Sequence, residues 1–91
     1  IHKGTIENAY TISNGEYEVI EAEIVETSEL INKEIKNSDL PEELRIGAVL
    51  RDKKVIIPRS NFIFKKDDKV VFIVKKDSIS FVENIFRLSS V

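Results

Sequence analysis

The sequence has 91 residues but no cysteine, methionine or tryptophan, and it contains only one histidine, two prolines and three glycines. Because cysteine is absent, the chain forms neither disulfide bonds nor thiolate metal sites, and small secreted domains commonly need such links. A zinc ion would find only His2 beside carboxylates, which make a poor zinc shell. No apolar run approaches the roughly 18 residues of a membrane-spanning helix, so direct membrane insertion is not expected.

The sequence also lacks the residue arrangements that catalytic sites require. No serine lies in a nucleophile elbow, and Gly4, Gly15 and Gly47 are too far apart to form a phosphate-binding loop. His2 lies near the start of the sequence, where a solvated position at a helix end is its ordinary role. We therefore predict that this chain is not an enzyme and has no catalytic residue, metal site or cofactor of its own.

The composition is that of one small folded domain. Hydrophobic residues make up 42% and charged residues 33% of the sequence, a balance that argues against disorder. The 14 basic and 16 acidic residues give a net charge of −2. Proteins that bind nucleic acids through phosphates usually carry a basic excess, so a nucleic acid is not an expected partner.

Acidic residues are concentrated between positions 16 and 29, and two interpretations are open for them. Their carboxylates could supply oxygen ligands for a cation such as calcium. They could also form the solvated face of an edge strand, where charge discourages aggregation. The absence of a D-x-D-x-D-G loop favours the second interpretation. The residues are Glu16, Glu18, Glu21, Glu23, Glu26 and Glu29.

Hydrophobic periodicity predicts an α+β fold with a mixed, largely antiparallel sheet and two helices, in the order β-β-α-β-β-β-α. The strongest local signal is Asn14-Gly15, which predicts a hairpin over residues 5–26. A helix is expected over residues 28–37, with Ser28 as its N-cap. Further strands are expected at 45–51, 54–58 and 69–75, with a short extended segment at 61–64 and a final helix that begins at Asp77 or Ser78.

The alternation of apolar residues predicts which strand positions face the core. Within residues 45–51, Ile46, Ala48 and Leu50 are expected on one face, and Arg45 and Arg51 on the other, provided that no bulge intervenes. The inward residues expected in the hairpin are Ile6, Tyr10, Ile12, Ile20, Ala22 and Ile24.

Basic residues surround the apolar segment 45–61. Two or three arginines beside an apolar groove can bind a phosphate through paired hydrogen bonds. Alternatively, these side chains solvate the hairpin and pair with the acidic strand, and their spacing favours neither interpretation. The residues are Arg45, Arg51, Lys53, Lys54 and Arg59.

Residues 4–86 resemble the C-terminal regulatory domain of TrkA-type potassium-uptake proteins, also called the RCK C-terminal or TrkA-C domain. The resemblance is carried by NGEYEVIEAEIVETSELINKEIKNSDLP, RIGAVLRDKKVIIPRSN, DDKVVFIV and FVENIF. Its most specific part is the order and spacing of Leu40-Pro41, Ile46-Gly47-Ala48-Val49 with Arg51, Ile57-Pro58 and Asp68.

The resemblance implies that residues 5–91 are a non-catalytic, cytoplasmic regulatory domain that forms a homodimer. In that family the domain normally follows a Rossmann-type domain that binds a nucleotide such as NAD or ATP/ADP. A ring of such proteins gates a membrane potassium transporter or channel. Residues 1–4 would then be the end of the helix that leaves the upstream domain, and the chain would act at the inner face of the cell membrane through its transporter partner.

Some relatives bind cyclic di-AMP between two such domains, which implies an alternative function as a sensor of an anionic effector, such as a (cyclic di)nucleotide, at the dimer interface. Ile35 and Ile46 would then form an apolar wall at the adenine, with Arg45 beside them. Residues 37–44 lack the longer Arg- and Tyr-Gly-containing loop of those relatives, which argues against cyclic di-AMP itself. The ligand-binding residues that we expect are Ile35, Arg45, Ile46, Arg51, Ile57, Pro58 and Arg59.

The family often has glycine where this chain has Asn32, Glu43 and Asp67. Asparagine and aspartate adopt left-handed backbone angles at modest cost, so positions 32 and 67 are compatible with the fold. Glutamate does so less readily, and the loop 41–44 is therefore expected to differ locally.

Overall fold

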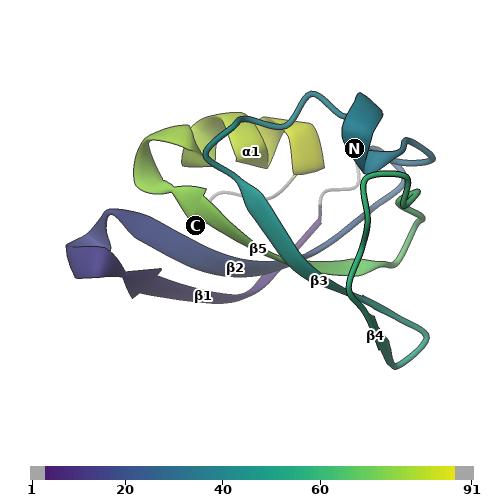
Figure 1. The fold of residues 1–91 in the computed structure, drawn as a ribbon, viewed down its shortest axis with the longest axis horizontal. Helices are drawn as coiled ribbons and strands as arrows, with labels where there is room; N and C mark the ends of the chain where they lie inside the picture. The colour runs from purple at the N-terminus through teal and green to yellow at the C-terminus, as the bar shows by residue number, and fades with distance from the viewer. Residues whose placement is uncertain (1–3, 88–91) are drawn as a thin grey trace.

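The computed structural model describes residues 4–87 (Figure 1). Five strands form one antiparallel sheet in the spatial order β1-β2-β5-β3-β4, and an α-helix lies on one side of it. The strands are β1 (Ile6–Ile12), β2 (Tyr17–Glu23), β3 (Arg45–Arg51), β4 (Lys54–Ile56) and β5 (Lys69–Lys75). The helix is α1 (Ile79–Phe86), and the 3-10 turns are η1 (Ser13–Gly15), η2 (Ile35–Asn37) and η3 (Lys76–Ser78).

The expected α+β class and antiparallel sheet are confirmed, but the expected element order is wrong in one place. Only one α-helix is present within residues 4–87, where two were expected. The helix end that was expected at residues 1–4 falls mainly on residues 1–3, which lie outside the described part of the chain. No helix among residues 4–87 is long and apolar enough to cross a bilayer.

The β1–β2 hairpin turns at Asn14-Gly15, as expected. Asn14 has a φ of 58° and Gly15 a φ of 85°, left-handed angles that these two residue types adopt most readily. The two strands pair antiparallel from Ile12 opposite Tyr17. Because β5 pairs with the other edge of β2, the second strand of the hairpin lies inside the sheet.

One face of the sheet and α1 enclose the core. The Phe86 ring of α1 stacks on Phe72 of β5, with ring centroids 4.9 Å apart and an angle of 20° between the rings. Along β5, and along β2 from Ile20 onward, every second residue is buried, the period expected for strands that are covered on one face. The buried residues on this face and just after it are Ile20, Ala22, Ile24, Val70, Phe72 and Val74.

A β-bulge interrupts β3 at Gly47. Ile46 lies opposite Phe72 and Ala48 lies opposite Val71, so two steps along β3 match only one step along β5. The extra residue reverses the alternation of faces along the strand.

The bulge overturns the expectation that Ile46, Ala48 and Leu50 share a face. Ile46 packs against the core, and the next inward residue is Val49, which is fully buried. Arg45 and Arg51 therefore lie on opposite faces of the sheet, although the sequence predicted that they share one.

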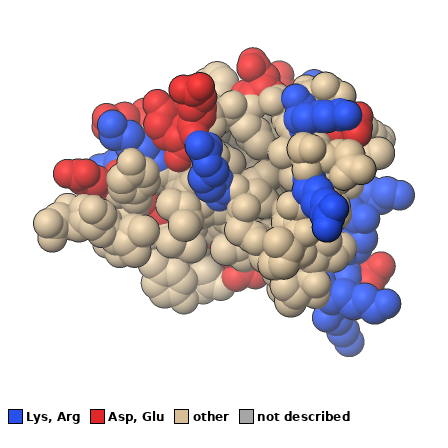
Figure 2. Space-filling view, in the orientation of Figure 1, with Lys and Arg blue, Asp and Glu red and all other residues tan. Residues whose placement is uncertain are grey.

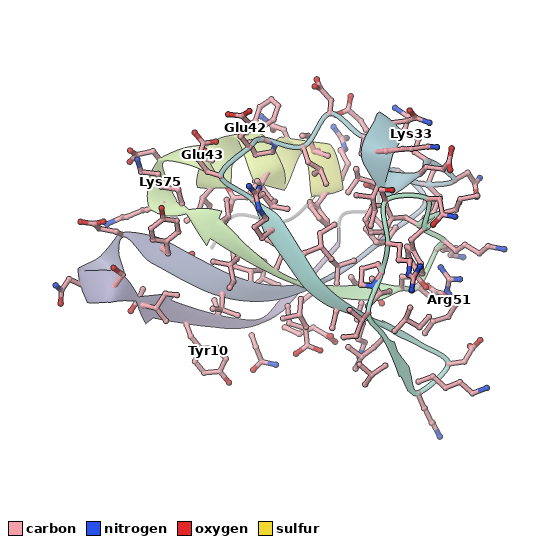
Figure 3. The ribbon with its side chains drawn as sticks, in the orientation of Figure 1. Tyr10, Lys33, Glu42, Glu43, Arg51 and Lys75 are labelled. Carbon is pink, nitrogen blue, oxygen red and sulfur yellow. The ribbon has the colours of Figure 1, made fainter. Side chains whose placement is uncertain are left out.

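A second bulge between Ile6 and Asn8 has the same effect on β1. Ile6 lies opposite the buried Ala22 and packs against the core. Beyond the bulge, Tyr10 and Ile12 point to the other face and are 63% and 42% exposed, so their expected inward orientation is wrong. Figure 3 shows the Tyr10 side chain directed away from the body of the domain.

The segment 28–37, which was expected to be an α-helix, consists of turns that end in η2. Asn32 has a left-handed φ of 61°, and Glu34 is extended with φ −72° and ψ 149°. Both conformations interrupt a helix. Residues 32–36 instead pair with residues 60–64, with a bridge between Glu34 and Ile63. This long-range pairing overrides the local helical pattern.

Candidate functional site

An open pocket of about 410 Å³ lies between η2, the loop 38–44, the start of β3 and residues 58–60. It brings together five of the seven residues that the sequence suggested for ligand binding, although they come from three separate segments between residues 35 and 59. These five residues are Ile35, Arg45, Ile46, Pro58 and Arg59.

One wall of the pocket is a short antiparallel ribbon formed by residues 32–36 and 60–64, hereafter the wall ribbon. The backbone N–H of Ile35 donates to the carbonyl of Phe62 at 2.9 Å, and that of Lys36 donates to Ser60 at 2.9 Å. These two bonds place Ile35 beside Arg59 and Ser60 at the pocket. The wall ribbon is therefore the element that fixes the relative position of the two chain segments on this side.

The opposite wall is the start of β3 with the loop before it. Ile46, which lies opposite the buried Phe72 and directly before the bulge, faces the core side, where it is half-buried and lines the pocket. Leu44, which is 5% exposed, anchors the loop in the core. Ile46 and Leu44 therefore supply part of the apolar lining of the pocket.

Arg45 and Arg59 supply the positive charge of the pocket. Both residues are exposed, and both line the pocket. The Arg45 guanidinium is held against the loop, because its Nη1 donates to the carbonyl of Leu44 at 3.0 Å and also to the carbonyl of Glu42. An apolar wall with two guanidinium groups is chemically suited to an anionic ligand that also carries an apolar part.

Arg51 and Ile57 do not line this pocket. Figure 3 places Arg51 at one end of β3, whereas Glu42, from the pocket loop, lies at the other end. Arg51 forms an ion pair with Asp68, with its Nη2 2.6 Å from Oδ2. This hydrogen bond raises the pKa of Arg51, so the guanidinium remains charged until the solution is strongly alkaline. Ile57 is 74% exposed.

Part of the pocket lining, mostly in the loop before β3, was not predicted from the sequence. Leu40-Pro41 was recognised as a family motif but was not assigned to a ligand site. The sequence does contain a signal for this loop, because the residue before a proline disfavours helical backbone angles. The lining residues that were missed are Ser38, Leu40, Pro41, Glu42, Leu44 and Ser60.

The remaining charged side chains are unevenly distributed. Figure 2 shows several lysine and arginine side chains at the end of the domain where the β3–β4 hairpin lies and a group of acidic side chains in the upper left part of the view. The surface between them is mostly uncharged but includes single basic side chains. Within residues 4–87, no three histidine, cysteine or acidic side chains are grouped so that they could hold a metal ion.

Comparison with known proteins places this fold and pocket in a family. The profile of the TrkA-C domain matches residues 19–87, which include every strand from β3 to β5 and all of α1. The chain belongs to the TrkA-C domain family. The matched range includes the residues that line the pocket, the bulge of β3 and the Arg51–Asp68 pair.

Relatives of this TrkA-C domain carry names that refer to potassium uptake. The chain is 36% identical over 89 residues to the Trk system potassium uptake protein TrkA of Azorhizobium caulinodans, covering 98% of the chain and 19% of that protein. It is 32% identical over 92 residues to the TrkA protein of Halomonas elongata, covering 97% of the chain and 20% of that protein. The chain therefore spans about a fifth of the length of these relatives.

Proposed function

We propose that this TrkA-C domain is the non-catalytic regulatory domain of a potassium-uptake protein. The supporting observation is the similarity to two Trk system potassium uptake proteins along almost the entire chain. In this proposal a Rossmann-type domain that binds NAD or ATP/ADP precedes residue 5. The protein acts in the cytoplasm on a membrane-embedded potassium transporter or channel, without entering the bilayer itself.

The regulatory role is testable by growth on limiting potassium. The full-length protein is expressed in a bacterial strain that lacks its own Trk regulator, and growth is compared with that of the same protein without residues 5–91. Loss of potassium-dependent growth, with normal expression of the shortened protein, is the expected result. Equal growth on limiting potassium with both proteins would contradict a regulatory role.

The proposal includes a homodimer formed through this domain. Exposed β-branched side chains support it, because Val55 and Ile57 are 67% and 74% exposed and a partner would cover them at a gain in free energy. Static light scattering of the 91-residue chain at high micromolar concentration is expected to give twice the monomer mass. A strict monomer under these conditions would contradict the dimer while leaving the potassium-uptake assay unaffected.

A second candidate function is the sensing of a small anionic effector in the pocket. The observation that favours it is the convergence of Ile35, Ile46 and Arg45 on one open cavity that also contains Arg59. Calorimetric titration with cyclic di-AMP, ATP, ADP and NADH tests this function. Binding of one of them at micromolar affinity is the expected result, and the absence of heat with all four would contradict it.

A further inference from the structure

Asp68 is the most deeply buried charged residue among residues 4–87, with 1% of its surface exposed. Its carboxylate accepts hydrogen bonds from Arg51 Nε at 2.8 Å and Nη2 at 2.6 Å, and from the backbone N–H of Lys65 at 2.9 Å. Three donors, two of them charged, satisfy the buried carboxylate. The Asp68 side chain therefore holds the Arg51 guanidinium in a fixed position.

In this position the Arg51 guanidinium also contacts the wall ribbon. Its Nη2 also donates to the carbonyl of Ile63 at 2.9 Å, and its guanidinium carbon lies 4.7 Å from the centre of the Phe62 ring. Both contacts are made to one strand of the wall ribbon, at residues 62 and 63. A single side chain thus connects β3, the turn at Asp68 and the wall ribbon.

The residues that Arg51 holds are the ones that position the pocket lining. The carbonyl of Phe62 accepts the hydrogen bond from the Ile35 backbone, and Ile63 is the bridge partner of Glu34. Ile35 lines the pocket from one strand of the wall ribbon, and Ser60 lines it two residues before Phe62 on the other. A displacement of Phe62 would therefore move Ile35.

We propose that the Arg51–Asp68 ion pair is a positioning device for the ligand pocket: it holds the wall ribbon in place, and Arg51 does not touch the ligand. This inference rests on the ligand-sensing function proposed above for the pocket. It assigns Arg51 a different role from the direct ligand contact that the sequence suggested. It also predicts a local effect on the wall ribbon, in contrast to a purely structural ion pair, which would affect the whole domain equally.

Amide hydrogen exchange of the 91-residue chain separates the two effects. The informative amides are those of Ile35 and Lys36, whose hydrogen bonds close the wall ribbon, and the reference is Phe72 in the central strand. The quantity compared is the exchange rate of the Ile35 and Lys36 amides divided by that of the Phe72 amide. In Asp68→Asn we expect this ratio to rise about 10- to 100-fold, because the variant loses hydrogen bonds to a charged group.

Arg51→Lys is the second variant, in case Asp68→Asn fails to fold. Lysine keeps the charge but cannot bind Asp68 through two nitrogens and Ile63 at the same time. It is therefore expected to raise the same ratio by a smaller factor. The matched control is Glu7→Gln, which removes the ion pair between Glu7 and Lys69, 3.2 Å apart, without a contact to the wall ribbon. The control is expected to leave the ratio unchanged.

Calorimetry on the same variants links the wall ribbon to binding. For whichever of cyclic di-AMP, ATP, ADP or NADH binds the wild-type chain, both variants are expected to weaken the affinity by a factor comparable to the rise in exchange ratio. If exchange and affinity both stay at their wild-type values in the folded variants, the positioning role is overturned. If the exchange ratio rises but no probe binds the wild-type chain, the Arg51–Asp68 pair still positions the wall ribbon, and the sensing function is what fails.

Discussion

The hydroxyl of Ser28 donates a hydrogen bond to the carbonyl of Ile85, 57 residues later in the chain, at 2.9 Å. The same carbonyl accepts the backbone N–H of Glu29 at 3.1 Å, and Ser28 Oγ accepts from Leu30 N–H at 3.1 Å. Ile85 lies in the last turn of α1, where carbonyls have no partner within the helix. The turn at Ser28 therefore completes the hydrogen bonding of a distant helix end.

Replacing Ser28 with alanine is expected to lower the free energy of unfolding by about 1–3 kcal/mol, the cost of leaving buried hydrogen-bonding groups without a partner. Ser28 is 4% exposed, so water cannot easily replace the hydroxyl. Urea denaturation measures the change. Ser60→Ala, at an exposed position, serves as the control and is expected to change the stability by less than about 0.5 kcal/mol. Equal effects of both substitutions would contradict the role of Ser28.

The two phenylalanines of α1 should respond very differently to truncation. Phe86 is fully buried against Phe72, and Phe86→Ala is expected to cost about 3–5 kcal/mol, because a cavity remains in the core. Phe81 is 46% exposed on the same helix, so Phe81→Ala should cost less than half as much. Thermal or urea unfolding followed by circular dichroism gives both values, and similar losses would mean that α1 packs on the sheet through another face.

The β3–β4 turn offers a stabilising substitution. Asp52 and Lys53 have φ of 51° and 67°, the pair of left-handed conformations of a type I′ turn. Glycine at the second position removes the steric cost of the lysine Cβ, so Lys53→Gly is expected to raise the free energy of unfolding by about 0.5–1 kcal/mol. Lys54→Gly, one residue later in β4, is the control and should not stabilise the domain. A loss of stability in Lys53→Gly would contradict this account.

Ligand binding in the pocket should depend on its two arginines. If a nucleotide probe binds, Arg45→Gln and Arg59→Gln are each expected to weaken it by about 1.5–3 kcal/mol, the value of hydrogen bonds to a charged group. Lys53→Gln removes a positive charge of the β3–β4 turn, away from the pocket lining, and should change the affinity far less. Equal effects of all three substitutions in calorimetry would indicate a general charge effect and no specific site.

Local sequence signals predicted the strands and the final helix because each has a short-range cause. Asn14-Gly15 determined the first hairpin, and the β-branched run from Lys69 to Lys75 predicted the central strand. At two of the three positions where the family often has glycine, Asn32 and Asp67 adopt positive φ as expected, while Glu43 is not among the positive-φ residues within 4–87.

The errors of the prediction have causes that short segments do not contain. A bulge at Gly47 depends on how β3 fits against β5, and one extra residue is enough to place Arg45 and Arg51 on opposite faces of the sheet. The expected helix at 28–37 had a correct apolar spacing, but residues 32–36 gain more from pairing with 60–64. The family resemblance suggested Ile35, Arg45 and Ile46, and the basic residues around the apolar segment suggested Pro58 and Arg59; the structure places all five at one pocket.

The position of β5 in the sheet constrains how the domain can fold on the ribosome. β5 lies between β2 and β3, so both of its neighbours are synthesised before it. Until residue 75 has left the exit tunnel, β3 cannot be joined to the β1–β2 hairpin, and the apolar inner faces of these strands stay unpaired. Because such long-range pairings form slowly, the nascent chain is most vulnerable to aggregation and proteolysis between the emergence of β2 and the emergence of residue 75.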